Sequence, residues 1–125
     1  MTGCETEIKS VMDDGALIVM LDGDIDHHNA RQIRGRIDTK MFVTRPRELV
    51  LDLSRVSFMD SSGLGLILGR YSKAMELGMG FRVVNPTPQI KRILDLAGTD
   101  RLIIIDNSDR KGAKKLYEKE NRNSK

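Results

Sequence analysis

The sequence is poor in cysteine, in aromatic side chains and in long hydrophobic runs. Its 125 residues include one cysteine (Cys4), no tryptophan, three phenylalanines and two tyrosines. One cysteine excludes an internal disulfide framework and a multi-cysteine metal site, and the scarcity of aromatic rings predicts an aliphatic core. No apolar run approaches the roughly 18 residues of a membrane helix, and the first residues lack the basic start and apolar block of a secretory signal. We therefore expect a cytoplasmic protein with no membrane partner.

The net charge is +3, but it is unevenly distributed. Residues 110–125 contain seven basic and two acidic side chains, whereas residues 1–109 contain 14 basic and 16 acidic ones. The basic character therefore belongs to the C-terminal tail. We expect no direct contact with nucleic acid, and a mildly acidic body that suits a basic partner surface.

Short apolar runs alternate with helical patterns, and this order predicts an α/β domain with a mostly parallel sheet. Strands are expected at residues 5–11, 16–21, 49–53, 81–84 and 102–105, and helices at 29–42, 61–77, 88–97 and 108–120. Asp22-Gly23-Asp24 is expected to end the second strand, Thr87 to cap the third helix, and Pro88 to occupy its first position. The first two strands, joined by a tight turn, are candidates for an antiparallel pair. We predict a single domain over 1–125 with about five strands and about four helices, a core at 5–120 and a basic tail at 110–125.

The most informative segment is Asp60-Ser61-Ser62-Gly63-Leu64-Gly65, which lies between a strong strand and a strong helix. It places two hydroxyls at a helix N-terminus, where backbone N–H groups are unpaired and an anion is tolerated. One interpretation is that a serine simply caps the helix. The other is that a serine accepts a phosphate, which would change the surface charge sharply with little change of fold.

Three glycines in the same region, Gly63, Gly65 and Gly69, suggest a nucleotide-binding loop. Their spacing is one residue longer than the dinucleotide fingerprint, and the residues between them are apolar. Close packing of the helix explains the glycines better. The alternative function from another class is nevertheless a small nucleotide-binding or hydrolytic protein that uses the Gly63–Gly69 loop.

The second polar cluster is Asp24-Ile25-Asp26-His27-His28, which follows another predicted strand. A metal site here would need ligands from elsewhere in the chain, so we expect none. A serine hydrolase is also disfavoured, because the nucleophile elbow G-x-S-x-G is absent: Asp60-Ser61-Ser62-Gly63 has an acid where the motif has a glycine. If the two strands are parallel neighbours, their loops share one edge of the sheet, and Asp26 could then lie close to Ser61.

Three segments together resemble the bacterial anti-sigma factor antagonists, which are STAS domains. They are residues 60–65 (DSSGLG) with 67–71 (ILGRY), residues 23–28 (GDIDHH) and residues 91–98 (KRILDLAG). The likeness runs in order from about residue 5 to about residue 120. The Asp-Ser-Ser-Gly-Leu-Gly block with Asp-His-His is most similar to the sporulation branch, which acts on the sigma-F pathway. The general-stress branch is the near alternative.

This resemblance implies a partner-switching protein that is not an enzyme and has no catalytic residue, cofactor or metal. In the family, the unphosphorylated antagonist binds an anti-sigma factor that is also a serine kinase, and the sigma factor is released. The kinase then phosphorylates the serine after the aspartate, here Ser61, and a PP2C-like phosphatase removes the phosphate. By the same resemblance, Ser62 is a structural or capping neighbour. The expected partner-binding residues are Asp26, His27, His28, Asp60, Ser62, Gly63 and Leu64.

Overall fold

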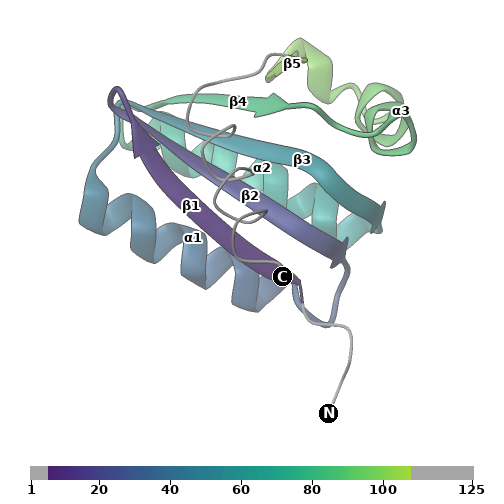
Figure 1. Ribbon diagram of the computed structural model, residues 1–125. Coiled ribbons are helices and arrows are strands. Elements are labelled where there is room, and N and C mark those ends of the chain that lie inside the picture. The colour runs from purple at the N-terminus through teal and green to yellow at the C-terminus, as the bar shows by residue number, and fades with distance from the viewer. Residues whose placement is uncertain (1–5, 108–125) are drawn as a thin grey trace.

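The apolar runs of the sequence form the strands of one mixed sheet in the computed structural model, which describes residues 6–107. In chain order the elements are β1 (Glu7–Asp13), β2 (Ala16–Ile25), α1 (Ala30–Thr44), β3 (Glu48–Met59), α2 (Ser61–Glu76), β4 (Gly80–Val84), α3 (Pro88–Leu96), the short 3-10 helix η1 (Thr99–Arg101) and β5 (Ile104–Asp106). The strand order in the sheet is β1-β2-β3-β4-β5 (Figure 1).

The sheet is parallel except for its first pair of strands. β1 and β2 are antiparallel and are joined through Asp14 and Gly15, which both have positive φ, as a tight hairpin turn requires. β2–β3, β3–β4 and β4–β5 are all parallel pairs. The predicted α/β class with a five-stranded, mostly parallel sheet is therefore confirmed. Three of the four predicted helices are present, and the fourth, at 108–120, lies outside the described residues, as does the basic tail.

The core is aliphatic, as the composition predicts, and occupies both faces of the sheet. α1 and α2 lie on the same side of the sheet (Figure 1), and there they bury Leu17, Val19 and Leu21 of β2 together with the alternate residues of β3. Ala16 and Ile18 of the same strand belong to a second, smaller buried cluster. β2 is thus buried on both faces, which explains why its sequence is a continuous apolar run.

Two strands extend further than the sequence predicts, and this brings their ends to one edge of the sheet. β2 does not end at Asp22-Gly23-Asp24 but continues to Ile25, so the predicted end was wrong. Gly23 has a φ of 130°, and the register against β3 shifts on either side of it, so the strand bulges rather than stops. β3 likewise continues to Met59, which pairs with Ile25.

The third helix begins as predicted. The Thr87 hydroxyl accepts a hydrogen bond from the Ile90 N–H at 3.3 Å, and Pro88 occupies the first helical position. After α3 the chain differs from the expectation, because η1 intervenes and the last strand starts at Ile104 instead of residue 102. These differences lie away from the polar loops that follow β2 and β3.

Candidate functional site

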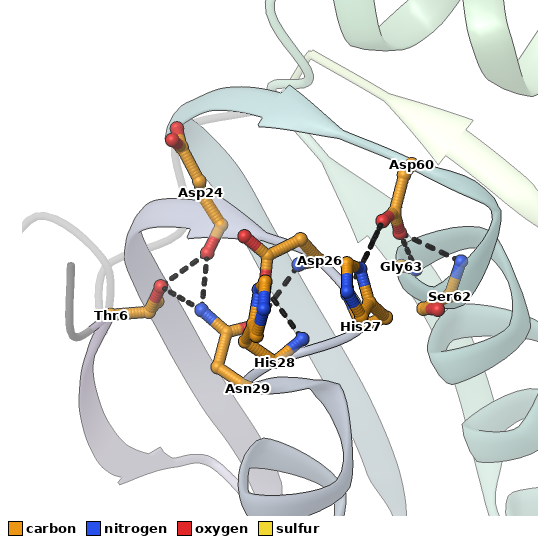
Figure 2. A network of polar contacts seen from close by, with 9 residues as sticks. All are labelled: Thr6, Asp24, Asp26, His27, His28, Asn29, Asp60, Ser62 and Gly63. Atoms are coloured by element: carbon orange, nitrogen blue, oxygen red, sulfur yellow. Dashed lines mark hydrogen bonds and ion pairs between the residues drawn. The ribbon is translucent and has the colours of Figure 1, made fainter.

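The two polar loops singled out in the sequence lie side by side at the edge where β2 and β3 end. The Asp60 N–H donates a hydrogen bond to the Ile25 carbonyl at 3.2 Å. In return, the His27 N–H donates to the Asp60 side chain at Oδ2 over 3.2 Å, so hydrogen bonds join the loop before α1 to the start of α2 (Figure 2). The expectation that both loops share one edge of the sheet is confirmed.

Asp60 is the N-cap of α2. Its backbone is extended, and its Oδ1 accepts hydrogen bonds from the N–H groups of Ser62 at 2.8 Å and Gly63 at 3.3 Å (Figure 2). The interpretation that a serine caps this helix was therefore wrong. A carboxylate one residue earlier satisfies the free N–H groups, because its side chain reaches the same positions that a serine hydroxyl would reach.

Ser61 is consequently released from any capping task. It is the first residue of α2 and is exposed to solvent. Its hydroxyl makes no hydrogen bond to another residue of the described part of the chain, and in particular none to His27 or His28. It therefore lacks the serine–histidine contact that a hydrolase nucleophile needs.

The charge of Asp60 is held in place by these contacts. Its partial burial acts to raise the pKa of the carboxyl, but this is outweighed by the hydrogen bonds from the N–H groups of Ser62, Gly63 and His27 and from the His27 side chain, so that the pKa of Asp60 lies below its usual value. Asp60 is thus an anion at neutral pH, directly beside the Ser61 hydroxyl.

The loop before α1 is stabilised by a network around Asn29 (Figure 2). The Asn29 side-chain amide donates to the Asp24 carbonyl at 2.9 Å and to the Thr6 hydroxyl at 3.0 Å, and its Oδ1 accepts from the Asp26 N–H at 3.0 Å. The Thr6 hydroxyl also donates to the Asp24 carbonyl. Sequence reasoning missed Thr6, since it lies 18 positions before Asp24 in the chain and no local pattern links the two residues. Asn29 was visible only as a residue near the start of the next helix.

His27, rather than Asp26, is the residue of this loop that contacts Asp60. The carboxylate of Asp26 accepts a hydrogen bond from the His28 N–H at 2.9 Å, so it is engaged within its own loop. His27 Nδ1 lies 3.5 Å from Asp60 Oδ2, and the rings of His27 and His28 are tilted against each other with centroids 4.0 Å apart. Both histidines are exposed, so they form part of the surface around Ser61.

The three glycines of α2 differ in how closely they are packed. A Cβ on Gly63 would lie 2.2 Å from Met59 Cγ and 3.1 Å from Ile25 Cγ2, so Gly63 is buried against the ends of both strands. A Cβ on Gly65 or Gly69 would meet nothing within 4 Å. The packing explanation is therefore right for Gly63 and wrong for the other two. The alternative of a nucleotide-binding loop at Gly63–Gly69 is not supported, because all three glycines lie within the helix α2 and form no loop.

A groove of about 420 Å³ lies between α1 and α2, next to the start of α2. We call it the basic groove. Its walls are formed by His27, Ala30, Arg31, Arg34, Ser62, Gly65 and Leu66. The sequence predicted a mildly acidic body, and at this groove that prediction was wrong, because the charge summed over residues 1–109 conceals a basic helix.

The structure also bears on the metal site and the membrane helix that the sequence argued against. Within residues 6–107, no group of three or more histidine, cysteine, aspartate or glutamate side chains is arranged to hold a metal ion. None of the helices formed by these residues is long and apolar enough to cross a membrane. Cys4 lies outside the described residues.

Comparison with known proteins places these features in a family. The STAS domain matches residues 7–118. The chain is 39% identical over 94 residues to the anti-sigma F factor antagonist of Paenibacillus polymyxa, which covers 74% of this chain and 80% of that protein.

Solved structures agree with this match. The unphosphorylated form of the anti-sigma factor antagonist SpoIIAA superimposes with a TM-score of 0.71 at 25% identity, over 91% of this chain and 97% of that one. The phosphorylated form of SpoIIAA, the cell fate determinant of Bacillus, gives a TM-score of 0.64 at 26% identity, over 94% and 98% of the two chains. By its sequence, its fold and the loops at the end of β2 and β3, the chain belongs to the STAS domain family.

Proposed function

We propose that this protein is an anti-sigma factor antagonist that binds an anti-sigma factor serine kinase and is switched off by phosphorylation of Ser61. The observation that carries the proposal is the exposed first residue of α2, whose hydroxyl has no structural task because Asp60 caps the helix. In its unphosphorylated form the protein would hold the kinase and release the sigma factor. A PP2C-like phosphatase would restore that form. A cytoplasmic location suits a partner that uses ATP.

The proposed modification needs no catalytic group from this chain. The kinase would transfer the γ-phosphoryl group of ATP to Ser61 Oγ, the hydroxyl proton would leave, and ADP would be the second product. Ser61 is exposed and lies at the start of a helix, which makes Oγ accessible to an active site on another protein. The chain therefore acts as a substrate and binding protein and not as an enzyme.

The electrostatic setting explains how one phosphate would disrupt binding. A phosphoserine adds about −1.5 to −2 charges at neutral pH, and Asp60 beside it is already ionised because its pKa is lowered by hydrogen bonds. A partner surface that fits a neutral serine would then meet repulsion and an unpaired, desolvated charge. Each 1.4 kcal/mol of such penalty weakens binding about tenfold.

The fold would tolerate the phosphate. The start of a helix accommodates an anion, and Ser61 is exposed, so no buried contact has to break. In the related SpoIIAA, structures of both the unphosphorylated and the phosphorylated form share this fold. The switch would therefore act through the surface rather than through refolding.

The residues expected to bind the partner surround Ser61 in different ways. His27 and His28 are exposed, and Asp26, Asp60, Ser62 and Leu64 are half-buried at the same edge of the sheet. Gly63 is buried, so its contribution is to the packing beneath the surface. We propose the other six as the direct contacts.

The test uses the purified protein, its cognate anti-sigma factor kinase and ATP. We expect phosphate on Ser61, located by mass spectrometry, with no labelling in Ser61→Ala and normal labelling in Ser62→Ala. Ser61→Asp should bind the kinase at least tenfold more weakly than the unmodified protein, measured by calorimetry. Its urea unfolding midpoint should match that of the unmodified protein, which separates loss of binding from loss of fold.

Two results would contradict the proposal. Binding of Ser61→Asp with unchanged affinity would exclude the switch. Turnover of a nucleotide by the isolated chain would instead support the alternative of a small nucleotide-hydrolysing protein.

A further inference from the structure

The basic groove lies beside Ser61, and its walls come from both sides of the site. His27 belongs to the loop after β2, Arg31 and Arg34 to the first turns of α1, and Ser62 to the first turn of α2. Figure 2 shows His27 between His28 and the Asp60 cap. The groove therefore brings two arginines and a histidine next to Ser62, the neighbour of Ser61 in the first turn of α2.

The positive charge of this wall continues along α1. The helix carries four basic side chains and one acidic one, while the rest of residues 1–109 carries ten basic and fifteen acidic ones. All four basic side chains are exposed and make no ion pair with a described residue. They are Arg31, Arg34, Arg36 and Lys40. A second hollow of about 480 Å³ follows the groove along α1, lined by Arg31, Gln32, Gly35, Arg36, Thr39 and Lys40.

The acidic side chain of α1 does not neutralise this surface. Asp38 forms an ion pair with Arg70 of α2, whose side chain is only 7% exposed. Its charge is thus paired between the two helices, although the Asp38 side chain itself is 33% exposed. An outward row of cations without acidic neighbours attracts an anionic partner and raises the rate of encounter with it.

The floor of the groove is open for a close approach. Gly65 is exposed, and a Cβ on it would touch nothing within 4 Å. A glycine inside a helix costs about 0.5–1 kcal/mol relative to alanine. Since the fold does not require glycine here, its effect is to leave room beside Ser62 for a group that comes from outside.

We propose that the basic groove receives an aspartate or glutamate side chain of the protein partner, so that the partner docks with an acidic surface against α1 next to Ser61. This inference rests on the proposed function, because it names how the anti-sigma factor would be held. It also describes the release step. A phosphate on Ser61 would compete with the partner's carboxylate for His27 and Arg31 and would repel it.

A protein carboxylate fits this groove better than a nucleic acid does. Asp60 and Asp26 border the same site, and the rest of the body carries the acidic excess described above. A continuous phosphate backbone would have to cross these acidic positions, whereas a single side chain need not. Local positive charge within a more acidic surface is typical of recognition between two proteins with complementary patches.

The experiment compares Arg31→Glu with a matched charge reversal elsewhere. Arg101→Glu is the control, because Arg101 is exposed on η1, which packs on α3 and β5. Binding of the unphosphorylated protein to the cognate anti-sigma factor is measured by calorimetry at low and high salt. We expect Arg31→Glu to weaken binding at least tenfold and to reduce its salt dependence, and Arg101→Glu to change affinity less than twofold.

A second variant tests the groove without changing a charge. Gly65→Leu keeps good helix propensity and fills the groove, so it should also weaken binding at least tenfold while its urea unfolding midpoint stays at or above that of the unmodified protein. If Arg31→Glu is not folded by circular dichroism, Arg31→Gln replaces it, with a smaller loss of affinity in the same direction.

The outcomes separate the two proposals. If the unmodified protein neither binds the anti-sigma factor nor is phosphorylated, the proposed function fails. If it binds and is phosphorylated on Ser61, but Arg31→Glu and Arg101→Glu bind equally well, only the inference about the groove is overturned.

The inference is also overturned if Arg31→Glu changes the binding of only the phosphorylated form, which would mean that the groove holds the phosphate of the same chain. Binding of duplex DNA that Arg31→Glu abolishes would assign the surface to nucleic acid instead.

Discussion

At the start of α2, neighbouring residues have separate tasks. Asp60 caps the helix through hydrogen bonds to the N–H groups of Ser62 and Gly63, and Gly63 lets the helix pack against Met59. Ser61 contributes to neither contact. Substitutions at Ser61 should therefore change only what the surface binds, whereas substitutions at Asp60 and Gly63 should also lower the stability of the fold, whatever they do to binding.

Gly63→Ala tests this division. The added Cβ would overlap Met59 Cγ, and the β-branched Ile25 beside it has little freedom to move. We expect the free energy of unfolding to fall by about 1–3 kcal/mol, as for overpacking elsewhere. Gly65→Ala is the matched control in the same helix and should raise it by about 0.5–1 kcal/mol, since nothing is near its Cβ. Urea unfolding measures both, and equal effects of the two substitutions would contradict the assignment.

At the scale of elements, α1 and α2 are joined by one buried ion pair as well as by apolar packing. Arg70 is 7% exposed and pairs with Asp38, which is 33% exposed. Burial first, and then the nearby charge of Arg34, lower the pKa of Arg70. The pair sets the two helices beside each other, and their first turns form the walls of the basic groove.

Asp38→Asn should leave the Arg70 charge buried without its counter-ion. Loss of one partner of a buried pair costs about 3–5 kcal/mol, and because Asp38 is partly open to water we expect about 3 kcal/mol. Replacing both partners by apolar side chains, Asp38→Leu with Arg70→Met, should recover most of this loss. A double-mutant cycle of urea unfolding measures the coupling, and a change below about 0.5 kcal/mol in Asp38→Asn would show that the pair is unimportant.

At the scale of the whole molecule, resistance to acid should depend on Asp60. Its pKa is lower in the folded protein than in the unfolded chain, since its hydrogen bonds to three N–H groups and to His27 exist only in the fold. Such a group stabilises the fold above its unfolded pKa, and the contribution is lost as the pH falls through the folded pKa. Asp60 thus links the global unfolding equilibrium to the protonation of the site.

Asp60→Asn provides the test, because asparagine is also a good N-cap but cannot ionise. The free energy of unfolding of this variant should be lower than that of the unmodified protein at neutral pH. The difference should shrink as the pH falls through the lowered pKa of Asp60 in the folded protein, where the aspartate becomes protonated. Urea unfolding at several pH values measures it, and a difference that grows as the pH falls would have the wrong sign.

The sequence was sufficient for the architecture because the strands and α2 are strongly patterned. It failed where a local signal was overridden by tertiary contacts. Asp22-Gly23-Asp24 is a turn motif, but pairing with β3 draws the strand through it. The choice between Asp60 and a serine as the cap depends on backbone geometry that composition does not reveal.

The candidate site was predicted in part. The meeting of the two loops followed from the position of each loop after a parallel strand, whereas the choice of Ser61 as the acceptor came from the family resemblance and stays a prediction. The contact between His27 and Asp60 was not predicted, since the side chains of adjacent residues point in different directions and only Asp26 had been expected near Ser61. The basic groove was invisible because it combines side chains from two helices, and the summed charge of the body has the opposite sign.

The hydrogen bonds between Asp60 and the neighbouring loop have a consequence for how a kinase would recognise Ser61. Asp60 accepts hydrogen bonds from the N–H groups of His27 and Ser62 and donates its own N–H to the Ile25 carbonyl, so the residues on both sides of Ser61 are held in place. A serine in the first turn of a helix cannot take the extended shape in which many enzymes read a peptide. A kinase acting on Ser61 would have to recognise the folded domain, and an unfolded copy would escape the modification. Phosphorylation would then act only on correctly folded molecules.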